Sequence, residues 1–189
     1  GCPGFNVKDD SYVDNPGGAV VIHKIGFSSP RVITYDDDDA AEFGTSVSVN
    51  AAGILAVGSN KGSVELFNLS NTPPSPIPIT STLGNDFDTT SVALNDNVPP
   101  LLAVGAIKEA EDRSGSVFLY TDVLNPNAVP VEISAPTAAK CGSGCLFGFS
   151  VALFDQTLVV GSPHSQSNAG RAFVYDLDQD NFEDKVQSL

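Results

Sequence analysis

Apolar residues along this chain fall into short runs that are separated by Gly, Asn, Asp, Ser and Pro. Typical runs are Ser46–Val49, Leu55–Gly58 and Val64–Phe67. Short runs rich in Val, Ile and Phe and bounded by turn residues predict β-strands. Because several runs are almost continuously apolar, we expect strands that are covered on both faces. No long segment has the period of a helix.

The runs recur in a fixed order. Phe43–Val47, Leu55–Ser59 and Gly62–Phe67 return as Phe147–Val151, Leu158–Pro163 and Gly170–Tyr175. A middle copy is degenerate at its start, where Asp88 takes the position of the phenylalanine. A partial copy opens the chain, with Gly1-Cys2-Pro3 aligned to Gly161–Pro163 and Gly17–Ile22 aligned to Gly170–Tyr175. The chain is therefore expected to enter in the middle of a repeat and to hold about three and a half units.

A further predicted strand precedes each unit, at Arg31–Tyr35, Pro76–Thr80 and Val129–Ile133. Prolines in the second and third of these suit an edge strand, which tolerates a missing donor. Four strands per unit predict an all-β fold of four-stranded antiparallel propeller blades. The expected units are 1–27 (partial), 28–70, 71–122 and 123–178, with 179–189 as a tail or the start of another blade.

The pattern resembles the FG-GAP repeat of integrin α-chain propellers and of many surface proteins. The residues that carry the resemblance are the repeated aromatic and glycine positions Phe43, Gly44, Gly58, Gly62, Gly105, Gly115, Phe147, Gly148, Gly161 and Gly170. The resemblance covers nearly the whole chain. It implies a propeller that acts in adhesion or surface recognition.

Integrin-type repeats often carry a calcium loop between their first two strands. The corresponding loops here are 50–53, 95–100 and 154–157, and none has the alternating oxygen ligands of such a site. The chain therefore resembles the shorter, calcium-free variety of the repeat. No cofactor is expected from these loops, and calcium remains open only for the acidic loops described below.

The formal net charge of the chain is −14. A chain this acidic has no cationic surface with which to bind nucleic acid or anionic membranes. No apolar run approaches the roughly 20 residues that span a bilayer, so no membrane insertion is expected.

Acidic residues gather in three loops. The members are Asp9, Asp10 and Asp14; Asp36, Asp37, Asp38 and Asp39; and Glu109, Glu111 and Asp112. The simplest interpretation is solvated loops; the alternative is a weak cation site or one negative rim that binds a partner. A run of adjacent carboxylates is a poorer cage than alternating ligands, because neighbours point to opposite sides.

Cys141 and Cys145 flank Gly142-Ser143-Gly144, and the spacing allows a close disulfide, with free thiols or a metal site as alternatives. Cys2 then has no assigned partner.

Asn68-Leu69-Ser70 is an N-glycosylation sequon. The Pro-rich stretch 71–78 is expected to be a stiff linker, with a glycosylated or ligand-like segment as the alternative.

A Ser162, His164 and Asp155 trio is present in the sequence, but no nucleophile elbow accompanies it. We therefore expect no enzyme. The sequence predicts a secreted or cell-surface interaction module that recognises proteins or glycans. The alternative is a building block of an extracellular filament, surface hair or coat. In either case the blade faces at the ends would be covered by other chains or by the rest of a parent propeller, because a blade is stable only between neighbours.

Overall fold

The computed structural model describes residues 18–23, 30–34, 42–60, 62–79, 87–108, 114–137, 144–178 and 187–188. Their strands form four antiparallel sheets, numbered in chain order. Sheet I contains β1 (Ala19–Ile22) and β2 (Arg31–Thr34). Sheet II contains β3 (Ser46–Val49), β4 (Ile54–Gly58), β5 (Val64–Asn68) and β6 (Ser75–Ile77). Sheet III contains β7 (Phe87–Leu94), β8 (Leu102–Lys108), β9 (Ser116–Tyr120) and β10 (Val131–Ser134), and sheet IV contains β11 (Ser150–Phe154), β12 (Thr157–Ser162), β13 (Arg171–Asp176) and β14 (Gln187–Ser188).

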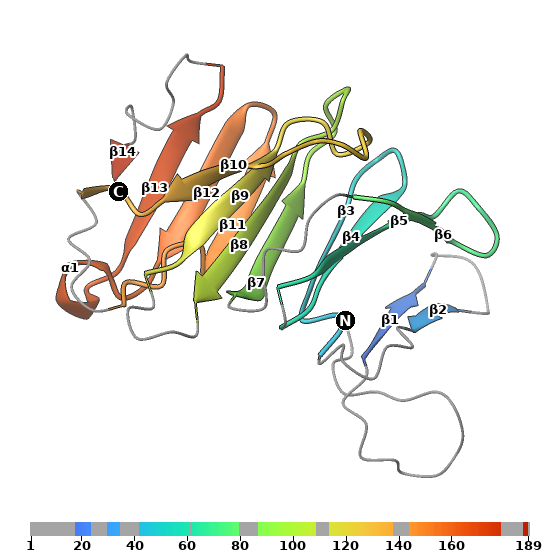
Figure 1. The fold of residues 1–189 in the computed structure, drawn as a ribbon, viewed down its shortest axis with the longest axis horizontal. Helices are drawn as coiled ribbons and strands as arrows, with labels where there is room; N and C mark the ends of the chain where they lie inside the picture. Colours follow the sequence, from blue (N-terminus) through green and yellow to red (C-terminus); the bar gives the residue numbers. More distant parts are fainter. Residues whose placement is uncertain are drawn as a thin grey trace, which may run out of the picture.

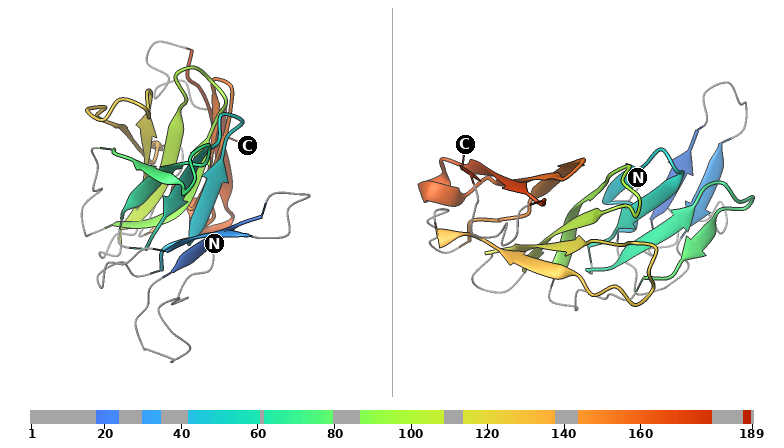
Figure 2. Two further views of the ribbon diagram at one scale, coloured as in Figure 1. Left: turned by 90° about the vertical axis from the view of Figure 1, so that its right-hand side faces the viewer. Right: turned by 90° about the horizontal axis from the view of Figure 1, so that it is seen from above.

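The fold class is all-β, with three four-stranded antiparallel sheets and one two-stranded sheet that resemble propeller blades. The sheets follow one another side by side in chain order (Figures 1 and 2). The short element α1 (Ser165–Asn168) has Gln166 and Ser167 in the left-handed region, so it is a compact turn and not a regular helix. No helix among the described residues is long and apolar enough to cross a membrane.

The sequence units and the sheets are offset by one strand. β2 pairs with β1, β6 pairs with β5, and β10 pairs with β9. The strand that opens each sequence unit is therefore the outermost strand of the sheet before it. β6 contains Pro76 and occupies the edge of sheet II, where a missing donor is tolerated.

The apolar core lies between the sheets and not inside any one of them. The first interface, between sheets I and II, buries Val20, Ile33, Phe43, Leu55, Val57 and Phe67. The second interface, between sheets II and III, includes Ala56, Leu66, Val92, Val104 and Phe118. The third interface, between sheets III and IV, includes Ala103, Leu119, Phe147, Phe173 and Tyr175. Each of the two middle sheets thus contributes one face to the interface before it and the other face to the interface after it.

This arrangement explains the continuous apolar runs. Every residue of β4 and of β9 is buried, because these strands lie in sheets that have neighbours on both sides. By contrast, β12, which is the strand of sheet IV equivalent to β4, alternates between buried residues and residues that are half-buried or exposed. The difference arises because sheet IV has a described neighbour on one side only.

The degenerate middle copy adopts a different local structure from the other two. Gly44 and Gly148 have positive φ values of 95° and 89° and form a turn before the innermost strand. Asp88 takes the preceding phenylalanine's position, and no glycine follows it. Instead, β7 begins at Phe87 and runs through this region with a register shift between Thr89 and Ser91. The loss of the glycine therefore replaces a turn with additional strand.

Candidate functional site

Serine hydroxyls join the innermost strands of successive sheets. Ser46 Oγ accepts a hydrogen bond of 3.0 Å from the backbone N–H of Val92. One sheet further on, Ser91 Oγ accepts one of 3.1 Å from the N–H of Val151. Because Ser46 pairs with Gly58 and Ser91 pairs with Gly105, the two serines hold equivalent positions. The same contact therefore recurs at two interfaces.

Asparagine side chains join the sheets at the loops that follow the innermost strands. Asn50 Nδ2 donates to the carbonyl oxygen of Asn95 at 3.1 Å, and Asn95 Nδ2 donates to that of Asp155 at 2.8 Å. The side-chain oxygens close their own loops. Asn50 Oδ1 accepts a hydrogen bond from Ile54 N at 2.9 Å, and Asn95 Oδ1 accepts one from Leu101 N at 2.8 Å. These amide oxygens thus serve loop closure.

The phenylalanine–glycine turns pack against glycines of the sheet before them. A Cβ atom on Gly115 would overlap the carbonyl oxygen of Phe147, and one on Gly105 would overlap that of Gly148. Gly18 makes the same approach to Phe43. The predicted alignment that starts at Gly17 is therefore wrong by one residue, because Gly18 is the residue that lies against the phenylalanine carbonyl as Gly115 does.

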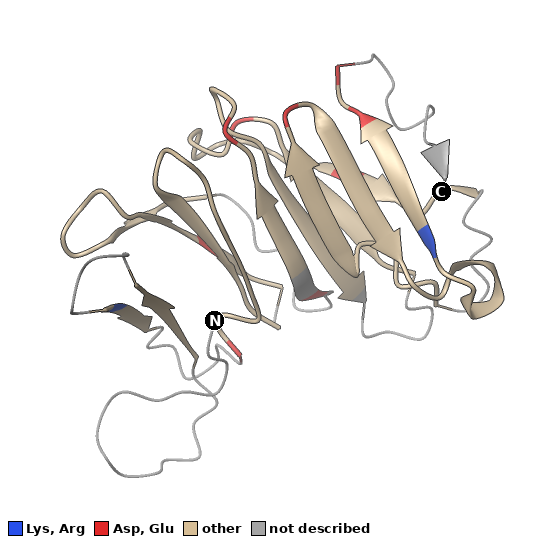
Figure 3. Cartoon of the chain, turned by 180° about the vertical axis from the view of Figure 1, so that it is seen from behind, with Lys and Arg blue, Asp and Glu red and all other residues tan. Residues whose placement is uncertain are grey.

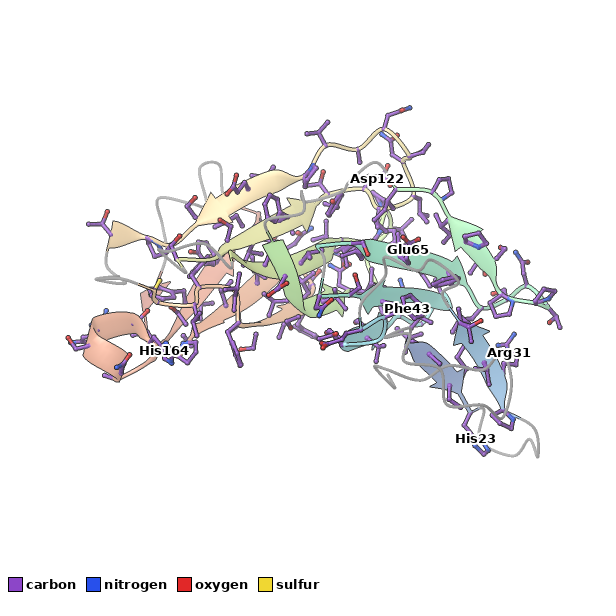
Figure 4. The ribbon with its side chains drawn as sticks, turned by 60° about the horizontal axis from the view of Figure 1, so that its bottom comes forward. His23, Arg31, Phe43, Glu65, Asp122 and His164 are labelled. Carbon is purple, nitrogen blue, oxygen red and sulfur yellow. The ribbon has the colours of Figure 1, made fainter. Side chains whose placement is uncertain are left out.

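The aromatic rings of these turns fill the interfaces. Phe147 is fully buried, with its ring centroid 5.7 Å from that of Phe173 and 6.5 Å from that of Tyr175. Phe43 contacts Phe67 edge to face at 6.3 Å in the first interface. Figure 4 shows Phe43 between sheets I and II, with Arg31 farther out along the same interface. Arg31 donates through both terminal nitrogens to the carbonyl oxygen of Leu69 at 3.1 Å.

Sheet IV presents a face that has no counterpart sheet among the described residues. Strand alternation and pairing register place the following residues on it, and together they are called the open face: Ser150, Ala152, Phe154, Val159, Gly161, Ala172 and Val174. Phe154 is 81% exposed, and Val159, Ala172 and Val174 are only half-buried.

The residues of the other sheets that are equivalent to Val159 and Val174 are fully buried. Val174 pairs with Val159 as Leu119 pairs with Ala103 and as Leu66 pairs with Ala56. Leu66 and Leu119 are 0% and 1% exposed. The open face is therefore a blade interface without its second half, and it is the candidate functional site.

The first interface is also only partly covered. Val47 and Val49 in β3 are 42% and 59% exposed, whereas the equivalent Val92 and Leu94 in β7 are 5% and 8% exposed. Sheet I consists of two described strands, and these cover the outer part of sheet II around Phe43 and Phe67. No described residue covers the inner part of sheet II around Val47 and Val49.

All ten acidic residues predicted as loop sites lie outside the described residues: Asp9, Asp10, Asp14, Asp36, Asp37, Asp38, Asp39, Glu109, Glu111 and Asp112. A cation site in these loops therefore stays a prediction. No group of three His, Cys, Asp or Glu residues suited to a metal is found in the described part.

Five other aspartates lie together at one end of the sheets, and sequence reasoning did not single them out as a group. They end or follow the first and third strands of sheets III and IV: Asp96, Asp122, Asp155, Asp176 and Asp178. Figure 3 shows red segments at this end, whereas Arg171 is the first residue of β13 and lies at its other end. The sequence shows an aspartate in or beside each of these loops. That the loops lie at the same end of the sheets follows only from the strand pairing.

Cys145 is buried, and its Sγ lies 3.3 Å from the carbonyl oxygen of Ser114. Because Cys141 and Cys2 lie outside the described residues, the disulfide stays a prediction.

Asn68 ends β5, and its Oδ1 accepts from Ser70 N at 2.9 Å in a local turn. Its glycosylation also stays a prediction.

The Ser162, His164 and Asp155 trio does not come together. Ser162 Oγ donates to the carbonyl oxygen of Cys145 at 2.9 Å and lies 2.6 Å from Ser165 Oγ. Asp155 lies in the hairpin at the opposite end of β12, roughly 17 Å away for a strand of this length. His23 and His164 lie at opposite ends of the molecule (Figure 4). These side chains therefore have separate structural surroundings.

Comparison with known proteins bears on the last blade. Residues 137–175 match the family described as FG-GAP repeat. This segment contains the Phe147-Gly148 turn and most of sheet IV. No curated protein matches the chain significantly.

Proposed function

We propose that this chain, which carries an FG-GAP repeat at residues 137–175, is a non-catalytic interaction module of the cell surface or extracellular space. The observation that supports the proposal is the open face of sheet IV. Val159 and Val174 on this face hold the positions of residues that are fully buried at the two interfaces before it. An apolar surface of this kind on a chain with a net charge of −14 favours a role in binding another polypeptide.

Two roles fit such a module. In the first, the chain takes part in adhesion, and its loops recognise a protein or a glycan partner. In the second, the chain is a building block of an extracellular filament, surface hair or coat that neighbouring chains complete. The open face and the exposed Val47 and Val49 favour the second role, since both ends of the described sheet series are uncovered.

Sedimentation velocity of the purified chain over a wide concentration range separates the two roles. Assembly predicts species that grow with concentration, and Val174→Lys should abolish this growth by placing a charge on the open face. Recognition predicts a monomer at every concentration that binds an immobilised glycan or protein. A monomer that binds neither would refute the proposed function.

Val98 provides the matched control for the charge added at Val174. It is an apolar residue in the β7–β8 loop that is not part of the open face, and it is 98% exposed. Val98→Lys adds the same charge as Val174→Lys. It should leave the association unchanged, which separates a local effect from a general change in net charge.

A further inference from the structure

We propose that the loops at one end of sheets III and IV bind a basic polypeptide segment that also carries apolar side chains. The segments concerned are 95–101, 121–130, 154–157 and 176–178, and together they are called the loop surface. The inference rests on the proposed function, because it names the partner class of an interaction module. The loop surface is distinct from the acidic loops expected from the sequence, which lie outside the described residues.

Hydrogen bonds between the segments make the loop surface continuous across the two sheets. Three contacts join them: Asn95 Nδ2 to the carbonyl oxygen of Asp155 at 2.8 Å, Val123 N to Pro100 O at 3.2 Å and Leu177 N to Gln156 O at 2.7 Å. Because each contact bridges two segments, the side chains that these segments expose belong to one surface.

Side-chain bonds fix the shape of the longest segment before any partner binds. Asp122 Oδ1 accepts a hydrogen bond from Leu124 N at 3.1 Å, and Asn125 Oδ1 accepts one from Asn127 N at 3.0 Å. Such local bonds hold a turn in one conformation. A surface that is organised in this way loses little conformational freedom on binding.

The apolar side chains of the loop surface include the three most exposed large ones in the described part of the chain. Val98, Val129 and Phe154 are 98%, 83% and 81% exposed, whereas the next value is the 59% of Val49 in β3. Leu124 adds a fourth at 49%. Single exposed apolar residues are ordinary, but four on joined loops indicate an interaction surface.

The charges around these apolar side chains select the partner. Every ionisable side chain of the loop surface is acidic: Asp96, Asp122, Asp155, Asp176 and Asp178. This surface repels anionic glycans and nucleic acid and attracts Lys and Arg side chains. The described carboxylates are not grouped in threes suited to a metal, so they fit several separate cations better than one ion. The complementary partner is therefore a polypeptide that carries Lys or Arg together with apolar residues.

The test measures by fluorescence anisotropy how a labelled synthetic peptide binds the full chain. The peptide contains Lys, Leu and Gly in equal shares, and its length of about 12 residues reaches roughly 40 Å when extended. We expect binding, and Phe154→Ser should weaken it roughly tenfold by removing an exposed ring. Phe149→Ser is the matched control, because Phe149 is 51% exposed and precedes β11 at the opposite end from Phe154. Val98→Ser repeats the test on a second loop and should also weaken binding.

A second pair of variants tests the charges. Asp155→Asn combined with Asp178→Asn removes two charges from the loop surface and should weaken binding about threefold or more at low salt. Glu42→Gln combined with Glu132→Gln removes two charges elsewhere and should leave the affinity unchanged. All four side chains are exposed, so the comparison isolates the position of the charge.

A companion peptide with Ser in place of Leu separates a specific surface from simple attraction to an acidic chain. It should bind roughly tenfold more weakly than the Leu peptide. Equal binding of the two peptides would overturn the proposal, as would the absence of binding or equal effects of Phe154→Ser and Phe149→Ser. If Phe154→Ser abolishes self-association of a chain that ignores the peptide, a second copy occupies these loops and the proposal is wrong.

Val174→Lys separates the loop surface from the open face, to which Phe154 also belongs. This variant changes the open face and leaves the four segments of the loop surface unaltered, so peptide binding should persist. Sedimentation of the unaltered chain tests the proposed function separately. A chain that assembles but ignores the peptide would overturn the present proposal alone.

Discussion

Ser46 and Val92 lie 46 residues apart in the sequence, yet the serine hydroxyl accepts a 3.0 Å hydrogen bond from the valine N–H. Ser91 and Val151 repeat this relationship at the next interface at 3.1 Å. The innermost strands are thus joined by side chain to backbone contacts that follow the repeat. The last member of the series, Ser150, has no such bond among the described residues.

Ser91→Ala should lower the free energy of unfolding by about 1 kcal/mol, because the N–H of Val151 loses its acceptor. Ser150→Ala is the matched control at the equivalent position, and it should change stability by less than about 0.5 kcal/mol. Urea unfolding of both variants measures the difference. Equal losses would show that the hydroxyl contact between strands does not contribute.

Phe147→Ala should lower the free energy of unfolding by about 3–5 kcal/mol, because the ring is fully buried in the third interface. Phe149→Ala, two residues away, removes a side chain that is 51% exposed and should have a much smaller effect. Chemical denaturation compares the two. A Phe149 variant as unstable as the Phe147 variant would contradict the assigned packing.

Gly115→Ala tests the close approach of the phenylalanine–glycine turn. Gly53→Ala is its control, because the two glycines have φ values of +75° and +77°, so an alanine at either position introduces the same backbone strain. A Cβ on Gly53 would have its nearest atom, Ser70 Oγ, at 3.4 Å, whereas one on Gly115 would overlap Phe147 O. We expect a loss of about 1–2 kcal/mol for Gly53→Ala and a clearly larger loss for Gly115→Ala. Similar losses would mean that the interface relaxes around the methyl group.

Calcium should leave the melting temperature of the chain unchanged. The Oδ1 atoms of Asn50 and Asn95 are bonded to backbone N–H groups of their own loops, so these oxygens do not form a cation cage. Thermal unfolding with calcium and with a chelator measures the effect. A saturable rise in melting temperature would contradict this expectation and favour a cation site in the three predicted acidic loops.

Sequence patterns predicted the strands and their repeat well, because each strand is a local run of apolar residues between turn residues. They did not reveal the contacts of Ser46, Asn50 and Ser91, since the partners lie 45 to 60 residues away. A local alignment also could not choose between Gly17 and Gly18, because only the contact with Phe43 identifies the equivalent residue.

The candidate site was predictable only in outline. The repeat count implied uncovered blade faces, but the residues of the open face follow from the pairing register of β11, β12 and β13. The half-buried Val174 looks like any strand valine in the sequence. Only the comparison with Leu66 and Leu119, which are buried at the same position of other sheets, identifies Val174 as part of an uncovered interface.

The most direct test of an open blade interface compares the free energies of unfolding of Val174→Lys and Leu119→Lys. A charge at position 119 enters the packed third interface and should cost several kcal/mol. The same change at position 174 places the ammonium group toward solvent and should cost less than about 1 kcal/mol. If Val174→Lys proves as destabilising as Leu119→Lys, the face of sheet IV is already covered within this chain, and its assignment as an open interface is wrong.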